Sequence, residues 1–238
     1  MSDYQVVTVA NRRPTEPYYT FDEFFKSVGE QVCLLGSGEN EYGGLGSKPR
    51  LLYHAIKDGF LNRKYLVFCD CFDLVFATTL EHLMLKYKQF AAPIVVSAEK
   101  NCFPGTYKDD FDARHIGNSP YKYLNSGMIV GETDAILAAL ESMNAPEIPN
   151  DYWDGEKMVN PNDQEYWQAE YVKQPVRIVL DTEQILCNTL HQVEIDELDF
   201  SEERIANKIT KTYPCSFHLN GGAKTGGLRE PILEHLKL

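Results

Sequence analysis

Two aspartates directly follow an apolar segment of the chain and are separated by two residues. The run Tyr65–Cys69 predicts a buried strand, and Asp70 and Asp73 come immediately after it. Two carboxylates at one sheet edge repel each other unless a cation neutralises them. Carboxylate oxygens suit Mg²⁺ or Mn²⁺, which keep coordination positions free for substrate phosphates. We therefore interpret Asp70 and Asp73 as metal ligands, with a helix cap or a loop salt bridge as the alternative.

A histidine and a glycine-rich turn near the C-terminus offer further groups of this kind. They lie in the segment Phe217–Lys224, whose sequence is FHLNGGAK. The His218 imidazole would complete a mixed carboxylate–imidazole site of a type compatible with Mn²⁺. The glycines would bring backbone N–H groups close to a phosphate, and Lys224 adds a positive charge. Taken alone, His218 is equally an ordinary strand-end histidine and the glycines a turn.

Three more polar segments could line a ligand site. Gly43–Lys48 places glycines and a lysine before a helix, which suits a sugar or a diphosphate, although the spacing is not that of a nucleoside-triphosphate loop. Leu124–Gly127 interrupts a strand with small polar residues, which marks the close approach of a ligand or of another backbone. Asp163 opens a helix, where it is either a helix cap or a functional carboxylate. A flexible surface loop is the alternative for Gly43–Lys48.

Alternating strands and helices predict one α/β domain over residues 1–238. The expected strands are Tyr4–Ala10, Val32–Leu35, Tyr65–Cys69, Pro93–Ser97, Tyr123–Gly131, Val176–Leu180 and Tyr213–His218. The expected helices are Phe21–Gly29, Pro49–Asp58, Thr79–Phe90, Thr133–Asn144 and Asp163–Lys173, and loops are expected at 36–48, 98–121 and 145–162. This order predicts a doubly wound, mostly parallel sheet with helices on both faces. Ligands bind such sheets at the carboxyl ends of the strands.

Composition limits the classes of partner. The 238 residues contain 23 lysines and arginines against 35 aspartates and glutamates, a net charge of −12, which disfavours nonspecific binding to nucleic acid. No apolar run approaches the ~20 residues of a membrane span, and no apolar signal segment follows Met1. We therefore expect a cytoplasmic protein (in the host cytoplasm if it is viral) that does not enter the membrane. The six scattered cysteines are expected to be reduced thiols.

Seven segments occur in an order that resembles the glycosyltransferase domain of the procollagen lysyl hydroxylase, or collagen glucosyltransferase, family and its stand-alone viral and microbial relatives. They are Val7–Ala10, Gly43–Lys48, Phe68–Asp73, Ser97–Glu99 with Cys102–Pro104, Leu124–Gly127, Asp163–Gln164 and His218–Lys224. The resemblance covers about residues 5–225. The chain departs from the family's pattern at Phe103, Leu219 and Gly222, where tryptophan, glycine and proline are usual.

The resemblance implies a GT-A type glycosyltransferase fold, a UDP-sugar donor, Mn²⁺ or Mg²⁺ as cofactor and retention of the anomeric configuration. By this resemblance the metal ligands are Asp70, Asp73 and His218. Thr8 and Phe72 contact the nucleotide, with Phe72 near the uracil, and Asn220, Gly221 and Lys224 contact the diphosphate. Lys48 and Asp163 lie at the sugar and reaction centre. We count Asn125, on the interrupted strand, with the last two as a catalytic group.

The acceptor implied by the resemblance carries a hydroxyl group, such as hydroxylysine in a collagen-like protein. One alternative is a phage-type DNA glycosyltransferase that acts on 5-hydroxymethyl pyrimidines. It would need a basic track and an aromatic pocket for an extruded base. The candidates are Arg12, Arg13, Lys100, Lys108, Arg114 and Lys122 for the track, and Phe103, Tyr107, Phe111 and Tyr121 for the pocket. A second alternative is a nucleotide-sugar-binding module without catalytic activity.

Overall fold

Six strands form the central sheet in the computed structural model, which describes residues 2–29, 31–38, 42–173 and 178–238. They are β1 (Tyr4–Val9), β2 (Val32–Leu35), β3 (Tyr65–Cys69), β5 (Ile94–Glu99), β6 (Tyr123–Glu132) and β9 (Ile178–Asp181). Their order across the sheet is β2-β1-β3-β6-β5-β9, and β6 alone of the six runs antiparallel to its neighbours. The prediction of a mostly parallel α/β sheet is therefore confirmed.

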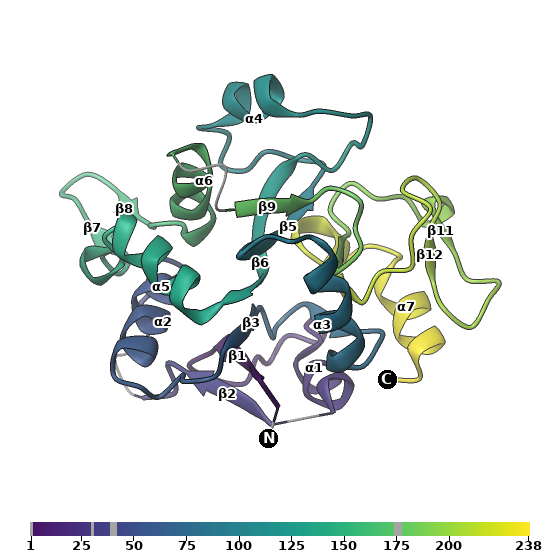
Figure 1. Ribbon diagram of the computed structural model, residues 1–238, viewed down its shortest axis with the longest axis horizontal. Coiled ribbons are helices and arrows are strands. Elements are labelled where there is room, and N and C mark those ends of the chain that lie inside the picture. Colours follow the sequence, from purple (N-terminus) through teal and green to yellow (C-terminus); the bar gives the residue numbers. More distant parts are fainter. Residues whose placement is uncertain (1, 30, 39–41, 174–177) are drawn as a thin grey trace.

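Helices cover both faces of this sheet (Figure 1). The helices α2 (Ser47–Lys57), α5 (Thr133–Ser142) and α6 (Asp163–Lys173) lie on one side, and α1 (Phe21–Val28) and α3 (Leu80–Gln89) lie on the other. Successive residues of a strand point to opposite faces. Val7 accordingly packs in the buried cluster of the first three helices, whereas Val6 packs in the cluster of the other two. The doubly wound arrangement follows from strands that are apolar on both sides.

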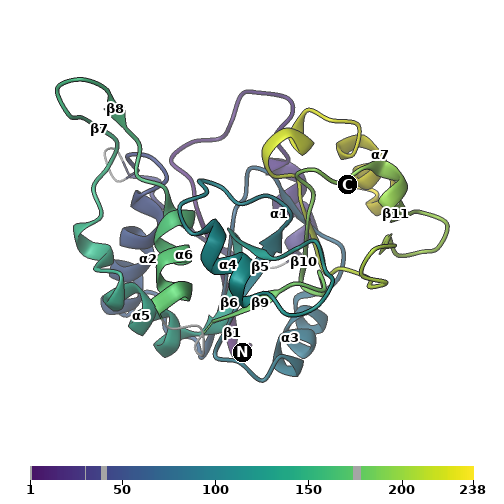
Figure 2. The ribbon, with the colours of Figure 1, turned by 90° about the horizontal axis from the view of Figure 1, so that it is seen from above.

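A second, smaller sheet is formed by β4 (Leu74–Phe76), β10 (Cys187–Thr189) and β13 (Ser216–His218), in the order β10-β13-β4. No strand is predicted at β4, and the strand expected over 213–218 is shorter in the structure. The remaining elements are α4 (Lys108–Arg114), α7 (Arg229–Leu236), the hairpin strands β7 (Tyr152–Trp153) and β8 (Met158–Val159), β11 (Leu198–Asp199), β12 (Ala206–Asn207), and the 3-10 helices η1 (Ala145–Glu147), η2 (Ile195–Glu197) and η3 (Gly221–Lys224). Figure 2 shows the β7–β8 hairpin projecting from the body of the protein.

Several predicted boundaries are wrong. Helix α4 lies inside the loop predicted at 98–121, because Phe111 is buried and stacks on Tyr171 with ring centroids 5.1 Å apart. Seven residues are too few to show a helical period. Helix α2 begins at Ser47 instead of Pro49, so Lys48 lies in its first turn. Residues 39–41 of the glycine-rich loop and 176–177 of the predicted strand lie outside the described residues.

In the described ranges, every helix is either too short or too polar to pass through a lipid bilayer.

Candidate functional site

The pairing of β4 with β13 brings His218 beside the two aspartates. His218 is opposite Leu74 in this antiparallel pair, and the Leu219 N–H donates to the Asp73 carbonyl at 2.7 Å. The Asp70 N–H donates to the Gly127 carbonyl at 2.9 Å, which fixes Asp70 against β6. Residues from three separate parts of the sequence therefore meet at the carboxyl edge of β3, where ligands bind in folds of this type.

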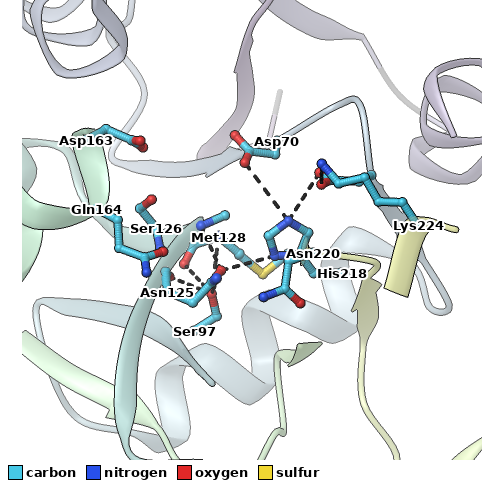
Figure 3. Close-up of polar contacts among 12 residues, drawn as sticks. Asp70, Ser97, Asn125, Ser126, Met128, Asp163, Gln164, His218, Asn220 and Lys224 are labelled. Atoms are coloured by element: carbon cyan, nitrogen blue, oxygen red, sulfur yellow. Dashed lines mark hydrogen bonds and ion pairs between the residues drawn. The ribbon is translucent and has the colours of Figure 1, made fainter. Parts of the chain in front are cut away.

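Asp70, Asp73 and His218 form a cluster that could hold a metal ion. One potential ligand atom from each residue lies within 4.8 Å of the others. His218 Nε2 is 3.2 Å from Asp73 Oδ1 and 4.0 Å from Asp70 Oδ2 (Figure 3). Two carboxylates and one imidazole fit Mn²⁺ and leave coordination positions for phosphate oxygens. The three residues proposed from the sequence as metal ligands are thus brought together.

Asn125 determines which nitrogen of His218 faces the aspartates. Its Oδ1 accepts a hydrogen bond from the Gly127 N–H at 3.0 Å, so this atom is an oxygen and an acceptor. His218 Nδ1 lies 3.0 Å from the same oxygen and therefore carries a hydrogen. The lone pair of Nε2 is then available to a metal, as a metal-binding histidine requires.

Two lysines balance the acidic side chains of the cluster. Lys48 Nζ lies 2.6 Å from Asp70 Oδ1 and 3.7 Å from Asp163 Oδ2, and Lys224 Nζ lies 2.7 Å from Asp73 Oδ2. Burial opposes the charge of Lys48, but Asp163 and Asp70 outweigh it and raise the pKa of this lysine. Burial likewise opposes the charge of Asp73, but His218 and Lys224 together lower its pKa. The buried charges are consequently stabilised by each other.

Asp163 is a buried carboxylate at the start of α6. It is 2% exposed, and its Oδ2 accepts no hydrogen bond from the described residues. Burial raises the pKa of Asp163, and the nearby Lys48 ammonium offsets that rise only in part. A buried oxygen without a donor requires an explanation, and one aimed into a cavity is suited to a ligand.

A cavity of about 420 Å³ contains most of the predicted site residues. Those on its wall are Lys48, Asp70, Asp73, Asn125, Asp163, His218, Asn220, Gly221 and Lys224. Leu45 and Phe103 also line it, and both are largely exposed, at 43% and 55%. The central cavity therefore has a polar, charged floor and two apolar side chains that are open to solvent.

The remaining two predicted residues lie elsewhere. Phe72 lines a second cavity of about 330 Å³ together with Tyr19, Tyr42 and the segment after β1. Lys224 Nζ lies 5.3 Å from the centre of the Tyr19 ring, so this lysine stands between the two cavities. Thr8 is fully buried on β1 and lines neither cavity. Its contact with a nucleotide stays a prediction.

Most glycines of the predicted sugar loop serve packing. A Cβ at Gly43 would lie 2.2 Å from Asn150 Cγ, and one at Gly44, whose φ is +103°, would lie 2.1 Å from Asp151 Oδ1. These glycines let the loop lie against the segment before the β7–β8 hairpin. Of the segment Gly43–Lys48, only Leu45 and Lys48 line the central cavity.

Glu99, Gln164 and His191 also line the cavity, although no site role is predicted for them from the sequence. Glu99 is the last residue of a fully buried strand, and a carboxylate at that place is a signal of the same kind as Asp70. Gln164 follows Asp163 and shares its helix start. His191 lies in the irregular segment after β10, where no periodicity marks it.

The aromatic pocket that the DNA alternative requires is not formed. Phe111 and Tyr121 are 2% and 0% exposed and belong to the hydrophobic core, and Tyr107 packs against that core. Phe103 alone of the four lines the central cavity. Aromatic residues in a long segment more often pack the segment than bind a ligand, which is the outcome here.

Comparison with known protein families identifies this architecture. The family model described as the PLOD GT domain matches residues 1–228. An uncharacterized mimivirus protein, R699, is 28% identical over 88% of this chain and 44% of its own length. The procollagen-lysine,2-oxoglutarate 5-dioxygenase of Drosophila melanogaster is 27% identical, and human form 2 is 26% identical, each over 92% of this chain. The match covers 31% and 30% of those two proteins, so the chain spans less than half the length of these relatives.

Two solved structures with a similar fold are glycosyltransferases. A glycosyltransferase involved in the glycosylation of the major capsid of PBCV-1 superimposes with a TM-score of 0.51 at 14% identity, with 98% of both chains covered. Mouse xyloside xylosyltransferase 1 superimposes with a TM-score of 0.52 at 11% identity, covering 92% of this chain and 98% of its own. These similarities confirm the GT-A type fold.

Proposed function

Because this chain belongs to the PLOD GT domain family and is a glycosyltransferase domain, we propose that it transfers a sugar from a UDP-sugar to a hydroxyl acceptor with Mn²⁺ as cofactor. The observation that carries this proposal is the cluster of Asp70, Asp73 and His218 at the floor of a cavity that also contains Lys224. A binding module without activity would have no need of Asp163, a buried carboxylate beside that cluster with an oxygen that accepts no hydrogen bond from the described residues.

The two cavities fit the two ends of a nucleotide sugar. Phe72, Tyr19 and Tyr42 offer aromatic faces for the uracil in the second cavity. Lys224 stands between that cavity and Asp73, where the diphosphate of such a donor would lie. The sugar would then occupy the central cavity, near Lys48 and Asp163.

The chemistry assigned to these residues is stabilisation of charge. In the reaction a bond forms between the acceptor oxygen and the anomeric carbon, while the bond from that carbon to the diphosphate oxygen breaks. The acceptor proton leaves with the diphosphate in a retaining, front-face transfer. A bound metal ion would supply Lewis-acid stabilisation of the leaving diphosphate. Lys224 would neutralise the same negative charge, and Asp163 would stabilise positive charge on the sugar ring.

We propose a protein hydroxyl, such as hydroxylysine, as the acceptor. The Drosophila and human relatives are procollagen-lysine,2-oxoglutarate 5-dioxygenases. Phe103 and Leu45, which are largely exposed, offer apolar contacts in the central cavity.

Calorimetric titration of UDP tests the donor half of the proposal. With Mn²⁺ the protein should bind UDP, with EDTA the affinity should fall sharply, and His218→Ala should make binding insensitive to Mn²⁺. His54, which is exposed on α2 and lines neither cavity, provides the control variant His54→Ala, expected to behave as the parent. Equal UDP affinity with Mn²⁺ and with EDTA in the parent protein would contradict the metal assignment. UDP release from a UDP-sugar, measured with the same samples, tests for activity.

A further inference from the structure

Glu99 connects three parts of the site. It ends β5, is 3% exposed, and lines the central cavity. Its Oε1 accepts hydrogen bonds from Asn125 Nδ2 at 3.2 Å and Gln164 Nε2 at 2.9 Å, and its Oε2 accepts one from Asn220 Nδ2 at 2.9 Å. The three donors come from β6, α6 and the C-terminal segment (Figure 3 shows Asn125 and Asn220 beside His218, and Gln164 beside Ser126).

Backbone groups fix the orientation of every one of these amides. Gln164 Nε2 also donates to the Phe103 carbonyl at 2.7 Å, and its Oε1 accepts from the Ser126 N–H at 3.2 Å. Asn220 Oδ1 accepts from the N–H groups of Leu190 and His191. The Oδ1 atom of Asn125 accepts from Gly127 N–H, as described above. All three NH₂ groups therefore point at Glu99, and residue 99 has to be an acceptor on both oxygens.

We infer that Glu99 is the positioning residue of the metal centre, acting on His218 through Asn125. The carboxylate holds the NH₂ group of Asn125, so that Asn125 Oδ1 faces His218 Nδ1 at 3.0 Å. That contact keeps the hydrogen on Nδ1 and directs the lone pair of Nε2 toward Asp70 and Asp73. Such outer partners of a metal-binding histidine set its tautomer and ring orientation. Through Asn220, the same carboxylate holds the start of η3, which carries Lys224.

A glutamine cannot replace Glu99 in this role. Glutamine has one acceptor oxygen and an NH₂ group, so at least one of the three amides would face another donor. The change Glu99→Gln keeps the size of the side chain and alters only its acceptor pattern and charge. It therefore separates positioning from packing.

Glu170 provides a matched control. It is also a buried glutamate, at 1% exposed, near the C-terminal end of α6, where it accepts a hydrogen bond from Ser142 Oγ at the end of α5. Glu170→Gln makes the same chemical change at a comparable depth but outside the site. Any general effect of a buried glutamine should appear in both variants.

The test measures metal affinity and the His218 ring directly, and it rests on the proposed metal-dependent donor binding. In the presence of UDP, Glu99→Gln should bind Mn²⁺ about 10- to 100-fold more weakly than the parent, the usual effect of losing such a partner. Glu170→Gln should bind as the parent does. Equal Mn²⁺ affinity in Glu99→Gln and the parent would overturn the inference, as would a weaker affinity of the same size in Glu170→Gln.

Nitrogen-15 spectra of the parent protein with UDP and diamagnetic Zn²⁺ give a second measurement that needs no variant of Glu99. The His218 ring should carry its hydrogen on Nδ1, and that hydrogen should exchange slowly with water; comparison with His218→Gln assigns the signal. A hydrogen on Nε2, or rapid exchange at Nδ1, would overturn the inference even if Glu99→Gln failed to fold. A parent protein that binds no Mn²⁺ with UDP would instead contradict the proposed function.

Discussion

Among single residues, Lys48 and Asp163 show how charge is arranged for chemistry. Lys48 lies between two carboxylates, 2.6 Å from Asp70 and 3.7 Å from Asp163, and is 7% exposed. A buried charge of this kind is tolerated only with partners. The Lys48 ammonium donates a hydrogen bond to Asp70 and lies too far from Asp163 to donate one there, so Asp163 Oδ2 has no hydrogen-bond donor among the described residues. This oxygen could accept a hydrogen bond from a sugar hydroxyl or stabilise a positive charge on the sugar ring.

Replacement of this carboxylate by an amide should separate binding from turnover. We expect Asp163→Asn to keep UDP affinity near that of the parent, because Asp163 pairs with Lys48 and does not line the cavity that contains Phe72. Turnover should fall by at least ~10²-fold with the loss of charge stabilisation. Calorimetry with UDP and the steady-state rate of UDP release measure the two quantities. Asp134, in the first turn of α5 and exposed, gives the control Asp134→Asn. If Asp163→Asn released UDP at a rate within a few-fold of the parent, the role of Asp163 would be limited to capping the start of α6.

Among the elements, the irregular stretch of β6 matters most for the site. The pairing of β5 with β6 shifts register between Val96 and Ala98, and this irregularity turns Asn125 and Gly127 toward His218. A Cβ on Gly127 would lie 2.0 Å from Cε1 of the His218 ring. The histidine can therefore reach the two aspartates only because residue 127 has no side chain.

Gly127→Ala should displace the His218 ring and weaken metal binding. Gly131 lies on the same strand, and a Cβ there would meet the Pro93 carbonyl oxygen at 2.7 Å, so Gly131→Ala is crowded as well but away from the site. Both variants should lose about 1–3 kcal/mol of stability, typical of overpacking, as read from denaturant unfolding. Only Gly127→Ala should also lower Mn²⁺ affinity in the presence of UDP. Equal Mn²⁺ affinity in the two variants would show that His218 tolerates the added methyl group.

Sequence patterns predicted the elements that are long and apolar, and missed those formed by tertiary contacts. The strand Tyr65–Cys69 is buried on both faces, and its composition alone identifies it. The three-residue strand Leu74–Phe76 exists through pairing with Ser216–His218, which no local pattern announces. The order of the motifs was enough to propose His218 as a metal ligand. Its distance from Asp70 and Asp73 depends on the register of the β4–β13 pair, which the sequence does not reveal.

The hydrogen-bonded partners of the site were the hardest to predict. Asn125 was assigned because small residues interrupt an apolar strand, a pattern visible in the sequence. Glu99 acts through amides from three segments, and its partners Gln164 and Asn220 are 65 and 121 positions away. Contacts of this range depend on how the strands and helices close around the cavity, so periodicity contains no information about them.

For the whole molecule, charge favours the proposed peptide acceptor over DNA. The net charge is −12, and four of the six basic residues proposed for a DNA track already pair with carboxylates. The pairs are Arg13–Asp22, Lys100–Glu197, Lys108–Asp112 and Lys122–Asp112. Each of these pairs reduces the positive field that attracts a phosphate backbone, whatever it contributes to stability. The pairing of these four side chains therefore reduces the compensation that the proposed track could offer for the overall negative charge.

We therefore expect transfer to a peptide acceptor and no measurable association with DNA. Incubation with Mn²⁺ and labelled UDP-sugars should label a hydroxylysine peptide and leave 5-hydroxymethylated duplex DNA unlabelled. Proteins that contact 6–10 phosphates bind DNA about 10³–10⁵ times more tightly at 50 mM than at 200 mM salt, so a mobility-shift measurement at low salt is the most sensitive search for DNA binding. A matched peptide that contains lysine instead of hydroxylysine controls for hydrolysis of the donor. Labelled DNA with an unlabelled peptide would reverse the order of the two acceptor classes, because it would require a phosphate-binding track that the pairing of these four basic residues argues against.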